Sequence, residues 1–192
     1  VGQGSGGSRG LARGWVHRDI KPKNLLVVGR GTAALVRLID FGLMAPAGEA
    51  SGSAGTLPYM APEVARGAPV DGRADLYSLG MVLYEALLPD DMARTVEEVA
   101  RQLIERPPLP SRVNPVIPTG LSEFVMRLIE PDPKDRFADA LAASEALSRL
   151  PGMRLGRGPA RAATERLLRA GAVSHRSRLV RKVRRMAKVV KE

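Results

Sequence analysis

The apolar residues of the chain follow a strand-like spacing near its start and a helical spacing further on. Two short apolar runs, at 25–28 and 35–39, are separated by a stretch that contains Gly-Arg-Gly, and this arrangement predicts a small β-hairpin. Residues 40–72 are rich in Gly, Ala, Pro and Ser and predict a long ordered loop. Loops of that length inside a compact domain are usually functional, so this loop is a first place to look for chemistry.

From residue 73 onward the apolar residues repeat every three or four positions, as the buried side of a helix does. The first such set comprises Leu76, Leu79, Val82, Leu83, Ala86 and Leu87, with Met81, Tyr84 and Leu88 on the other faces. A helix that is apolar on nearly all faces should be buried. We therefore expect this helix to form the spine of the domain.

Further helices are predicted beyond the spine helix. The apolar residues of 96–104 and of 121–129 have amphipathic spacing. A connector with five prolines between Pro107 and Pro118 separates these two segments, and an Ala- and Leu-rich helix is expected at 137–150. The body is thus predicted to be mainly helical, with one small β element at its front.

The composition narrows the chemistry that the chain can support. A length of 192 residues suits one domain with an appendage. The absence of Cys excludes a disulfide framework, a thiolate zinc site and a Cys nucleophile, so a metal would have to bind oxygen or His ligands. No apolar run approaches the ~20 residues that span a bilayer, and the start of the chain does not resemble a signal peptide. We therefore expect a cytoplasmic protein without a transmembrane segment.

Charge divides the chain into a neutral body and a basic tail. The net charge is +10 overall, but residues 1–150 carry −1 and residues 151–192 carry +11. Residues 1–10 hold five Gly and two Ser and predict a flexible leader. The leader matches the phosphate-loop spacing G-x-G-x-x-G, but no apolar strand precedes it to hold the glycines, so we treat the match as accidental. The predicted organisation is a leader at 1–10, a domain at 11–150 and a basic tail at 151–192.

The most informative stretch is His-Arg-Asp-Ile-Lys-Pro-Lys-Asn at residues 17–24. Further motifs follow it in order: Asp-Phe-Gly at 40–42, GTLPYMAPE at 55–63, DLYSLG at 75–80 and PKDR at 133–136. In these motifs the chain resembles the eukaryotic-like serine/threonine protein kinases. Its low aromatic content and its Ala-, Arg- and Gly-rich composition resemble the bacterial members, and the resemblance covers about residues 11–150.

The resemblance implies a fold and an activity. The fold would be α+β and mainly α, a small β-hairpin plus a helical bundle like the C-lobe of a protein kinase, within a truncated kinase-like fold. The activity would be transfer of the ATP γ-phosphate to a Ser or Thr hydroxyl of a protein substrate with Mg²⁺. Phosphoryl transfer needs an enzyme to position the acceptor and neutralise charge more than it needs covalent help. The motifs should therefore supply a base, a cation and metal ligands.

The resemblance assigns these roles to five residues. Asp19 would accept or orient the proton of the substrate hydroxyl, Lys21 would contact the transferring phosphate, and Thr56 would be the partner of Lys21 near Asp19. Asn24 and Asp40 would converge on Mg²⁺ as oxygen ligands, the donors that a hard cation prefers. Together with Lys21 they would hold Mg·ATP. The Lys21–Thr56 pair argues against a tyrosine-specific enzyme, and the predicted hairpin would hold both ligand-bearing loops on one support.

Three other matched residues resemble structural parts of the family. Glu63 and Arg136 resemble a buried ion pair that fixes the end of the activation segment to later helices. Breaking such a pair would leave a buried charge uncompensated, at a cost of ~3–5 kcal/mol. Asp75 resembles a carboxylate at a helix start that accepts backbone N–H groups from the turn at residues 17–18.

Arg18, which precedes Asp19, marks the subclass of the family that is usually switched by phosphorylation between the Asp-Phe-Gly and GTLPYMAPE motifs, where a phosphate would pair with Arg. The candidate acceptors there are Ser51, Ser53 and Thr56. A second interpretation, that the two serines only solvate a flexible loop, stays equally open.

The resemblance also implies that parts of the family's ATP site are missing. Only 18 residues precede Asp19, too few for the smaller lobe. No Lys precedes Lys21 and no Glu precedes Glu49, so the family's lysine–glutamate clamp on ATP is not matched. We expect a partial catalytic domain without measurable activity of its own, joined to an upstream N-lobe or a partner chain. The long helix that precedes the catalytic loop in the family is not matched either, and its loss should leave an apolar stripe exposed on the spine helix and its neighbours.

The basic tail has no match to the family. Residues 178–191 place apolar residues on one helical face and Lys and Arg on the rest, as a basic amphipathic helix does. Three interpretations stay open: a solvated extension, a binder of anionic membrane and a binder of nucleic acid phosphates. The tail has no aromatic residue to stack on bases, which favours the solvated extension and disfavours nucleic acid.

The rival function is a non-catalytic, pseudokinase-like interaction module with a basic anion-binding tail. The retention of Asp19, Lys21, Asn24 and Asp40 favours enzyme ancestry over this rival, because an inactive module has no chemical need for all four.

Overall fold

The computed structural model describes residues 14–29, 34–49, 55–89 and 107–151. Its elements are β1 (Trp15–Val16), η1 (Pro22–Asn24), β2 (Leu25–Val28), β3 (Leu35–Leu38), β4 (Ala45–Pro46), η3 (Leu57–Tyr59), α1 (Pro62–Ala65), α2 (Gly72–Leu87), α4 (Pro110–Val113), α5 (Thr119–Leu128) and α6 (Ala140–Ser148), where η marks a 3₁₀ turn. The predicted leader, the predicted helix at 96–104, the basic tail and the candidate acceptors Ser51 and Ser53 lie outside the described residues.

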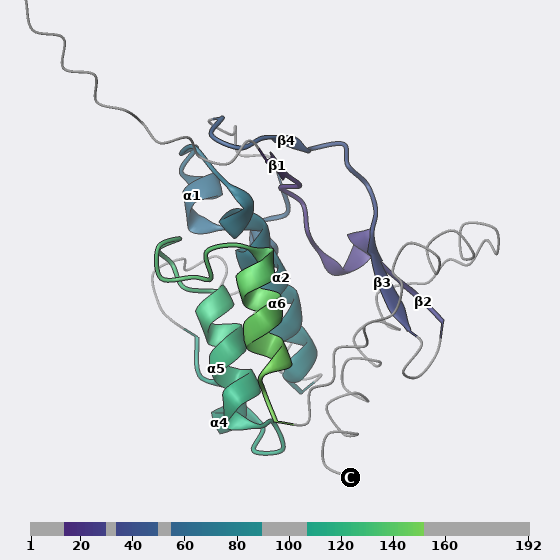
Figure 1. Cartoon of the computed structure of the whole chain (residues 1–192), viewed down its shortest axis with the longest axis vertical. Coiled ribbons are helices and arrows are strands. Elements are labelled where there is room, and N and C mark those ends of the chain that lie inside the picture. Colours follow the sequence, from purple (N-terminus) through teal and green to yellow (C-terminus); the bar gives the residue numbers. More distant parts are fainter. Residues whose placement is uncertain (1–13, 30–33, 50–54, 90–106, 152–192) are drawn as a thin grey trace, which may run out of the picture.

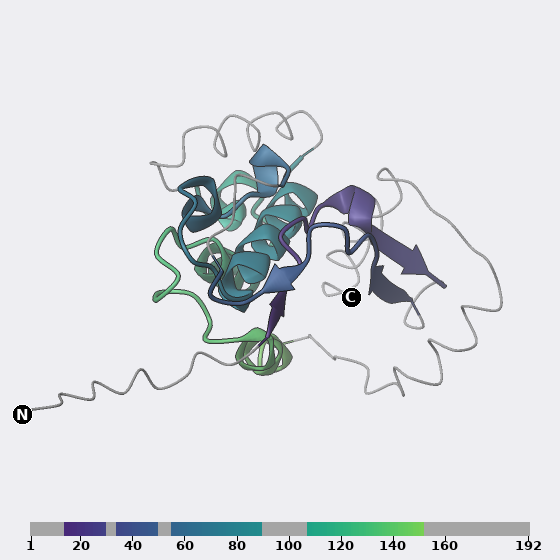
Figure 2. The same cartoon turned by 90° about the horizontal axis from the view of Figure 1, so that it is seen from above.

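The strands β2 and β3 form the predicted hairpin. They pair antiparallel, with Leu25 opposite Leu38 and Val28 opposite Leu35. Leu and Val dominate both strands. Val is β-branched, and such residues favour the pleated, half-buried surface of a strand. The hairpin projects to one side of the helical body in both views (Figures 1 and 2). The prediction of a hairpin at this place is confirmed.

The prediction of a single β element is wrong, because β1 and β4 form a second small antiparallel sheet. Trp15 lies opposite Pro46, and Val16 lies opposite Ala45. Two residues per strand are too few to show an alternating pattern, so this pairing could not be predicted from the apolar spacing. The predicted loop at 40–72 accordingly contains β4, η3 and α1 as well as irregular backbone.

The helix α2 is the predicted spine of the domain. It begins after Asp71, whose side chain accepts a hydrogen bond from the backbone N–H of Arg73 at 2.9 Å and so caps the helix. β1, η3, α5 and α6 all pack against it. Its apolar side chains are buried or half-buried, so the expectation of an exposed apolar stripe on this helix is wrong.

Most of the exposed large apolar side chains in the described part of the chain lie around the strands. Six of the nine are Trp15, Val36, Ile39, Phe41, Leu43 and Met44; the other three, Leu57, Val116 and Leu141, lie on the helical body. Five of these six belong to residues 36–44, which begin in β3 and run toward β4. The segment that carries the Asp-Phe-Gly motif therefore holds more than half of the exposed large apolar side chains.

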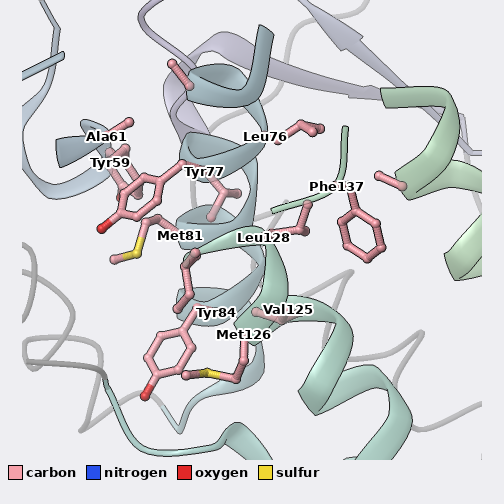
Figure 3. Close-up of a cluster of buried hydrophobic side chains, with 14 of the residues drawn as sticks. Tyr59, Ala61, Leu76, Tyr77, Met81, Tyr84, Val125, Met126, Leu128 and Phe137 are labelled. Atoms are coloured by element: carbon pink, nitrogen blue, oxygen red, sulfur yellow. The ribbon is translucent and has the colours of Figure 1, made fainter. Parts of the chain in front are cut away.

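The core lies between α2 and α5, and the close approach of the two helices depends on a glycine. Figure 3 shows Leu76, Met81 and Tyr84 along α2 and Val125, Met126 and Leu128 along α5. A Cβ atom at Gly80 of α2 would lie 2.6 Å from Cγ2 of Ile129 and 2.7 Å from Cβ of Leu128. Because glycine has no Cβ, the two backbones can come this close.

The last predicted helix is shorter than expected. The sequence predicts a helix at 137–150, but α6 begins at Ala140 because Asp139 caps it, accepting a hydrogen bond from the N–H of Ala142 at 2.8 Å. Phe137 precedes the helix, and its ring lies 5.2 Å from that of Phe124. The proline-rich connector contains the short helix α4. This helix begins at Pro110, and proline is well accepted at the first position of a helix. Among the described helices none is long and apolar enough to cross a bilayer.

Candidate active site

Asp19, Lys21 and Thr56 form one hydrogen-bonded cluster. The Lys21 Nζ lies 2.6 Å from Oδ2 of Asp19 and donates to Oγ1 of Thr56 at 2.9 Å. The Thr56 hydroxyl in turn donates to Oδ1 of Asp19 at 2.9 Å. The structure thus brings together three residues that are separated by up to 37 positions in the sequence.

Asn24 also contacts the Asp19 carboxylate, at the oxygen that Lys21 contacts. Its amide nitrogen donates to the backbone oxygen of Asp19 at 2.9 Å and to the carboxylate Oδ2 at 3.0 Å. The 3₁₀ turn η1, closed by the bond from the N–H of Asn24 to the carbonyl of Lys21, places the amide there. Because the nitrogen makes both contacts, the amide oxygen is turned away from the Asp19 carboxylate.

These neighbours keep Asp19 charged although it is buried. Burial alone would raise the pKa of the Asp19 carboxyl. The hydrogen bonds from Lys21 and Thr56, the charge of Lys21 and the hydrogen bond from Asn24 outweigh burial, so the pKa lies below its ordinary value. Asp19 is therefore an ionised acceptor at neutral pH, able to orient a hydroxyl proton.

The first turn of α2 fixes the backbone that leads into Asp19. Asp75 accepts hydrogen bonds from the backbone N–H groups of His17, at 2.8 Å, and Arg18, at 2.9 Å. Arg18 has φ 67°, a left-handed conformation that costs a non-glycine residue about 1–2 kcal/mol. Burial raises the pKa of Asp75, and the two backbone N–H bonds partly oppose this. The carboxylate holds the strained turn in place.

A glycine and a 3₁₀ turn place Thr56 beside the turn at residues 17–18. Gly55 has φ 136°, and a Cβ atom there would lie 2.9 Å from the backbone oxygen of Arg18, so glycine is needed at this close approach. The turn η3 follows directly, closed by a bond from the N–H of Tyr59 to the carbonyl of Thr56 at 2.9 Å. The Thr56 hydroxyl therefore lies within hydrogen-bond distance of Asp19.

Asp40 lies on the exposed side of the site. It has φ 65°, and its Oδ1 accepts a hydrogen bond from the N–H of Gly42 at 3.3 Å, a local bond that makes the left-handed conformation tolerable for Asp. The N–H of Ile39 donates to the backbone oxygen of Asn24 at 2.9 Å. The loops that carry Asn24 and Asp40 are thus joined at the base of the hairpin.

Glu63 and Arg136 form a buried ion pair away from this cluster. Two guanidinium nitrogens lie 2.7 and 2.9 Å from the two carboxylate oxygens. The same guanidinium donates to the backbone oxygens of Arg73, Glu130 and Pro131. The pair joins α1 to the start of α2 and to the loop that follows α5.

Sequence reasoning missed one buried polar pair near the site. The Tyr59 hydroxyl donates to Oε2 of Glu85 at 2.5 Å, and both residues are buried. A signal was present, because Glu85 is a carboxylate in the last turn of a helix that is apolar on nearly all faces. A buried carboxylate needs a partner, so its presence in such a helix indicates a contact with another element.

With this geometry established, comparison with known proteins assigns the family. The sequence profile of the protein kinase domain matches residues 12–149. The chain belongs to the protein kinase family.

Its curated relatives are bacterial serine/threonine kinases. The chain is 42% identical over 147 residues to serine/threonine-protein kinase Pkn1 of Myxococcus xanthus, which covers 71% of the chain and 21% of that protein. It is 38% identical over 150 residues to serine/threonine-protein kinase PknD of Mycobacterium tuberculosis, covering 71% of the chain and 22% of that protein. It is 36% identical over 144 residues to serine/threonine-protein kinase pkn3 of Myxococcus xanthus, a match that covers 67% of the chain and 26% of that protein. The chain therefore spans about a fifth to a quarter of the length of these relatives.

The comparisons confirm the predicted enzyme family, protein serine/threonine kinases of bacterial type. Members of this family use ATP and Mg²⁺ and act on protein substrates. The mainly helical body with its small antiparallel sheets is consistent with a kinase-like fold.

Proposed function

We propose that the chain carries out protein serine/threonine phosphorylation, with Asp19 orienting the acceptor hydroxyl and Lys21 placing positive charge beside the transferred phosphate. The observation that carries the proposal is the cluster in which Lys21 and Thr56 hold opposite oxygens of the Asp19 carboxylate. A charged, hydrogen-bonded carboxylate next to an ammonium group suits a reaction that depends on positioning and electrostatics.

The residues near the cluster fit Mg²⁺. Asn24 and Asp40 would hold it, one through an amide oxygen and the other through an exposed carboxylate. Within the described residues no group of three or more His, Cys, Asp or Glu could hold a metal ion. Mg²⁺ suits so small a donor set, because it usually keeps several waters and takes one or two protein oxygens plus substrate phosphates. When bound, it would neutralise charge on those phosphates.

The roles of the chain's own residues follow from the contacts. Asp19 would accept a hydrogen bond from the substrate hydroxyl on Oδ1, because a carboxylate oxygen can accept two hydrogen bonds and Oδ1 accepts from Thr56, whereas Oδ2 is contacted by both Lys21 and Asn24. The Lys21 ammonium would contact the transferring phosphate while Thr56 keeps Oδ1 in place. The proton of the hydroxyl would pass toward Asp19 as the new bond between the substrate oxygen and the γ-phosphorus of ATP forms, while the bond from that phosphorus to the β–γ bridging oxygen breaks and ADP leaves.

We further propose that transfer by this chain alone is slow or unmeasurable. Phe41 is 55% exposed, and Ile39 and Leu43 are each 40% exposed, so the side of the site that carries Asp40 is open to water. Exclusion of water strengthens the electrostatic interactions on which phosphoryl transfer depends. Residues that cover this side would therefore raise the rate.

The test separates nucleotide binding from transfer. We would measure binding of Mg·ATP by calorimetry to the chain and to Asp40→Ala, with Asp132→Ala, another exposed carboxylate, as the matched control. We expect Asp40→Ala to abolish binding and Asp132→Ala to leave it unchanged. Absence of binding in the unmodified chain would overturn the nucleotide part of the proposal and favour the non-catalytic interaction module.

Transfer is measured with peptides that differ only in the acceptor. We would incubate the chain, and any longer form of the protein that contains it, with Mg·ATP and with peptides that carry Ser, Thr or Tyr at the same position. Label should enter the Ser and Thr peptides only, and Asp19→Asn should remove it. Equal labelling of the Tyr peptide would contradict the assignment to serine/threonine kinases.

A further inference from the structure

The 3₁₀ turn that carries part of the cluster also carries a cation to which the proposed function gives no role. Lys23 is the middle residue of η1, and it is exposed although Pro22 and Asn24 on either side of it are buried. Within the described part of the chain, the Lys23 side chain forms no ion pair and no hydrogen bond. Its charge is therefore free to act on a ligand.

The geometry of the turn places this charge close to the acceptor side of the site. A 3₁₀ turn has three residues per revolution, so residues three apart lie on the same side of it. Lys21 and Asn24 share the side toward Asp19, since they contact its Oδ2 at 2.6 and 3.0 Å. Lys23 is directed to solvent instead, but its Cα lies only ~3.8 Å from that of Asn24. Lys23 is thus one residue removed from direct contact with Asp19.

The other charges near this turn are already compensated or have the same sign as Lys23. The Lys21 ammonium is compensated by the Asp19 carboxylate. The exposed Asp40 carboxylate is assigned to Mg²⁺ by the proposed function. Arg18 is also positive, and its guanidinium donates to a backbone oxygen, at 3.5 Å, and not to a carboxylate of the described residues. A peptide whose hydroxyl reaches Asp19 therefore lies beside a net positive surface.

The reach of a lysine matches the spacing of residues in an extended peptide. Successive residues of an extended chain are ~3.3 Å apart, so the two neighbours on each side of an acceptor lie within ~7 Å of it. Lysine has a flexible four-carbon stem, and its ammonium can stay in water while it follows a ligand. At physiological ionic strength the Debye length is ~8 Å, so charges this close are only partly screened.

We infer that Lys23 is a specificity-determining residue that selects acceptor peptides with an Asp or Glu within about two residues of the Ser or Thr. The inference deepens the proposed function and rests on it, because it names the substrate class of the same site. Lys23 takes no part in the transfer step. Its substitution should therefore change the KM for peptide and leave kcat nearly unchanged.

The test uses Ser peptides that differ only in the residues beside the acceptor. One set carries Asp at these positions, a second carries Ala and a third carries Lys. In any form of the protein that transfers phosphate, kcat/KM should be roughly fivefold higher for the Asp set than for the Lys set, the upper end for an exposed ion pair. Lys23→Ala should bring the two sets close to equal, and Lys23→Glu should reverse their order.

A matched charge reversal elsewhere provides the control. Lys134 is another exposed lysine, in the loop between α5 and α6, and Lys134→Glu makes the same change of charge. This variant should keep the preference for the Asp set. At ~1 M salt the Debye length falls to ~3 Å, and the preference of the unmodified protein should disappear. An unchanged preference in Lys23→Glu would overturn the inference, as would an equal loss in Lys134→Glu.

Binding experiments separate this inference from the proposed function. Fluorescence anisotropy of labelled Asp and Lys peptides gives the same preference as a ratio of Kd values in a chain that transfers nothing. Transfer without a charge preference would overturn the inference and leave the proposed function standing. A Lys23-dependent preference without transfer would do the reverse. Binding of neither peptide set, or a Lys23→Glu variant that loses Mg·ATP binding in calorimetry but keeps its peptide preference, would overturn the inference.

Discussion

The front of the molecule and its helical body differ sharply in burial. Residues 34–49, which carry Asp40, include no buried residue, whereas most residues from Tyr59 to Leu88 are buried. Five of the nine exposed large apolar side chains in the described residues belong to the first region. The polar pairs with the lowest exposure, Glu63 with Arg136 and Tyr59 with Glu85, lie in or against the second.

This difference separates two parts of one candidate site. The backbone that leads into Asp19 is held by Asp75 of α2, and Thr56 directly precedes the turn η3, which packs against α2. Asp40 is held by a bond to Gly42 within its own loop, and its loop by the backbone bond between Ile39 and Asn24. We expect substitutions in the body to act on stability and substitutions at the front to act on ligand binding.

The largest effect is expected from breaking the buried ion pair. Arg136→Met leaves the Glu63 carboxylate in the core without its partner, and this should lower the free energy of unfolding by ~3–5 kcal/mol. The exposed pair between Arg149 and Glu145 provides the control, and Arg149→Met should cost less than ~0.5 kcal/mol. Urea unfolding of both variants measures the two costs. Similar costs would mean that burial does not distinguish the pairs.

A smaller effect is expected from adding one methyl group between α2 and α5. Gly80→Ala gains helix propensity of ~0.5–1 kcal/mol, but the new Cβ clashes with Leu128 and Ile129. Overpacking of this kind costs ~1–3 kcal/mol, so we expect net destabilisation. Gly72→Ala, at the open start of the same helix, has no atom within 4 Å of the new Cβ and should be neutral or slightly stabilising. Thermal unfolding compares the two, and a stabilised Gly80→Ala would show that the helices can separate at low cost.

A pH dependence is expected at the start of α2. Burial tends to raise the pKa of Asp71, but hydrogen bonds from the Arg73 side chain and backbone, with the charges of Arg73 and Arg136, lower it overall. Its stabilising contribution is thus complete above the unfolded-state pKa of ~3.9 and is lost as pH falls through the lower folded-state pKa.

The variant Asp71→Asn isolates this charge, because Asn caps a helix about as well as Asp. The unmodified chain should be more stable than Asp71→Asn by up to ~1 kcal/mol above about pH 5, and the difference should shrink below about pH 4. Urea midpoints between pH 7 and pH 3 measure it. A difference that does not change with pH would assign the effect to packing instead of charge.

The smallest effect on stability is expected at the front. Phe41→Ala removes a ring that is 55% exposed and that touches the His17 ring edge-on at 5.3 Å between centroids, so it should cost less than ~1 kcal/mol. Phe124→Ala in the body, where the ring is 7% exposed, should cost ~3–5 kcal/mol. Equal losses in chemical unfolding would mean that the front is packed as tightly as the body.

Predictions from the sequence succeeded where the signal was local. Helical spacing predicted α2 and α5 to within a few residues, and two Leu- and Val-rich runs predicted the hairpin. The two-residue strands β1 and β4 lie about 30 residues apart and carry no period, so their pairing had no local signal. The start of α6 was set by Asp139, a cap that outweighed the apolar pattern beginning at Phe137.

The sequence by itself determined which side chains could do the chemistry, because Asp19, Lys21 and Asn24 lie within six consecutive residues of one motif. Only the tertiary structure decided how Thr56 reaches Asp19 and which buried carboxylate pairs with Tyr59, since those contacts join segments 26 to 37 positions apart. Such contacts form when η3 and the turn at residues 17–18 both dock on α2. Their geometry depends on the packing of the whole body, which no stretch of sequence encodes alone.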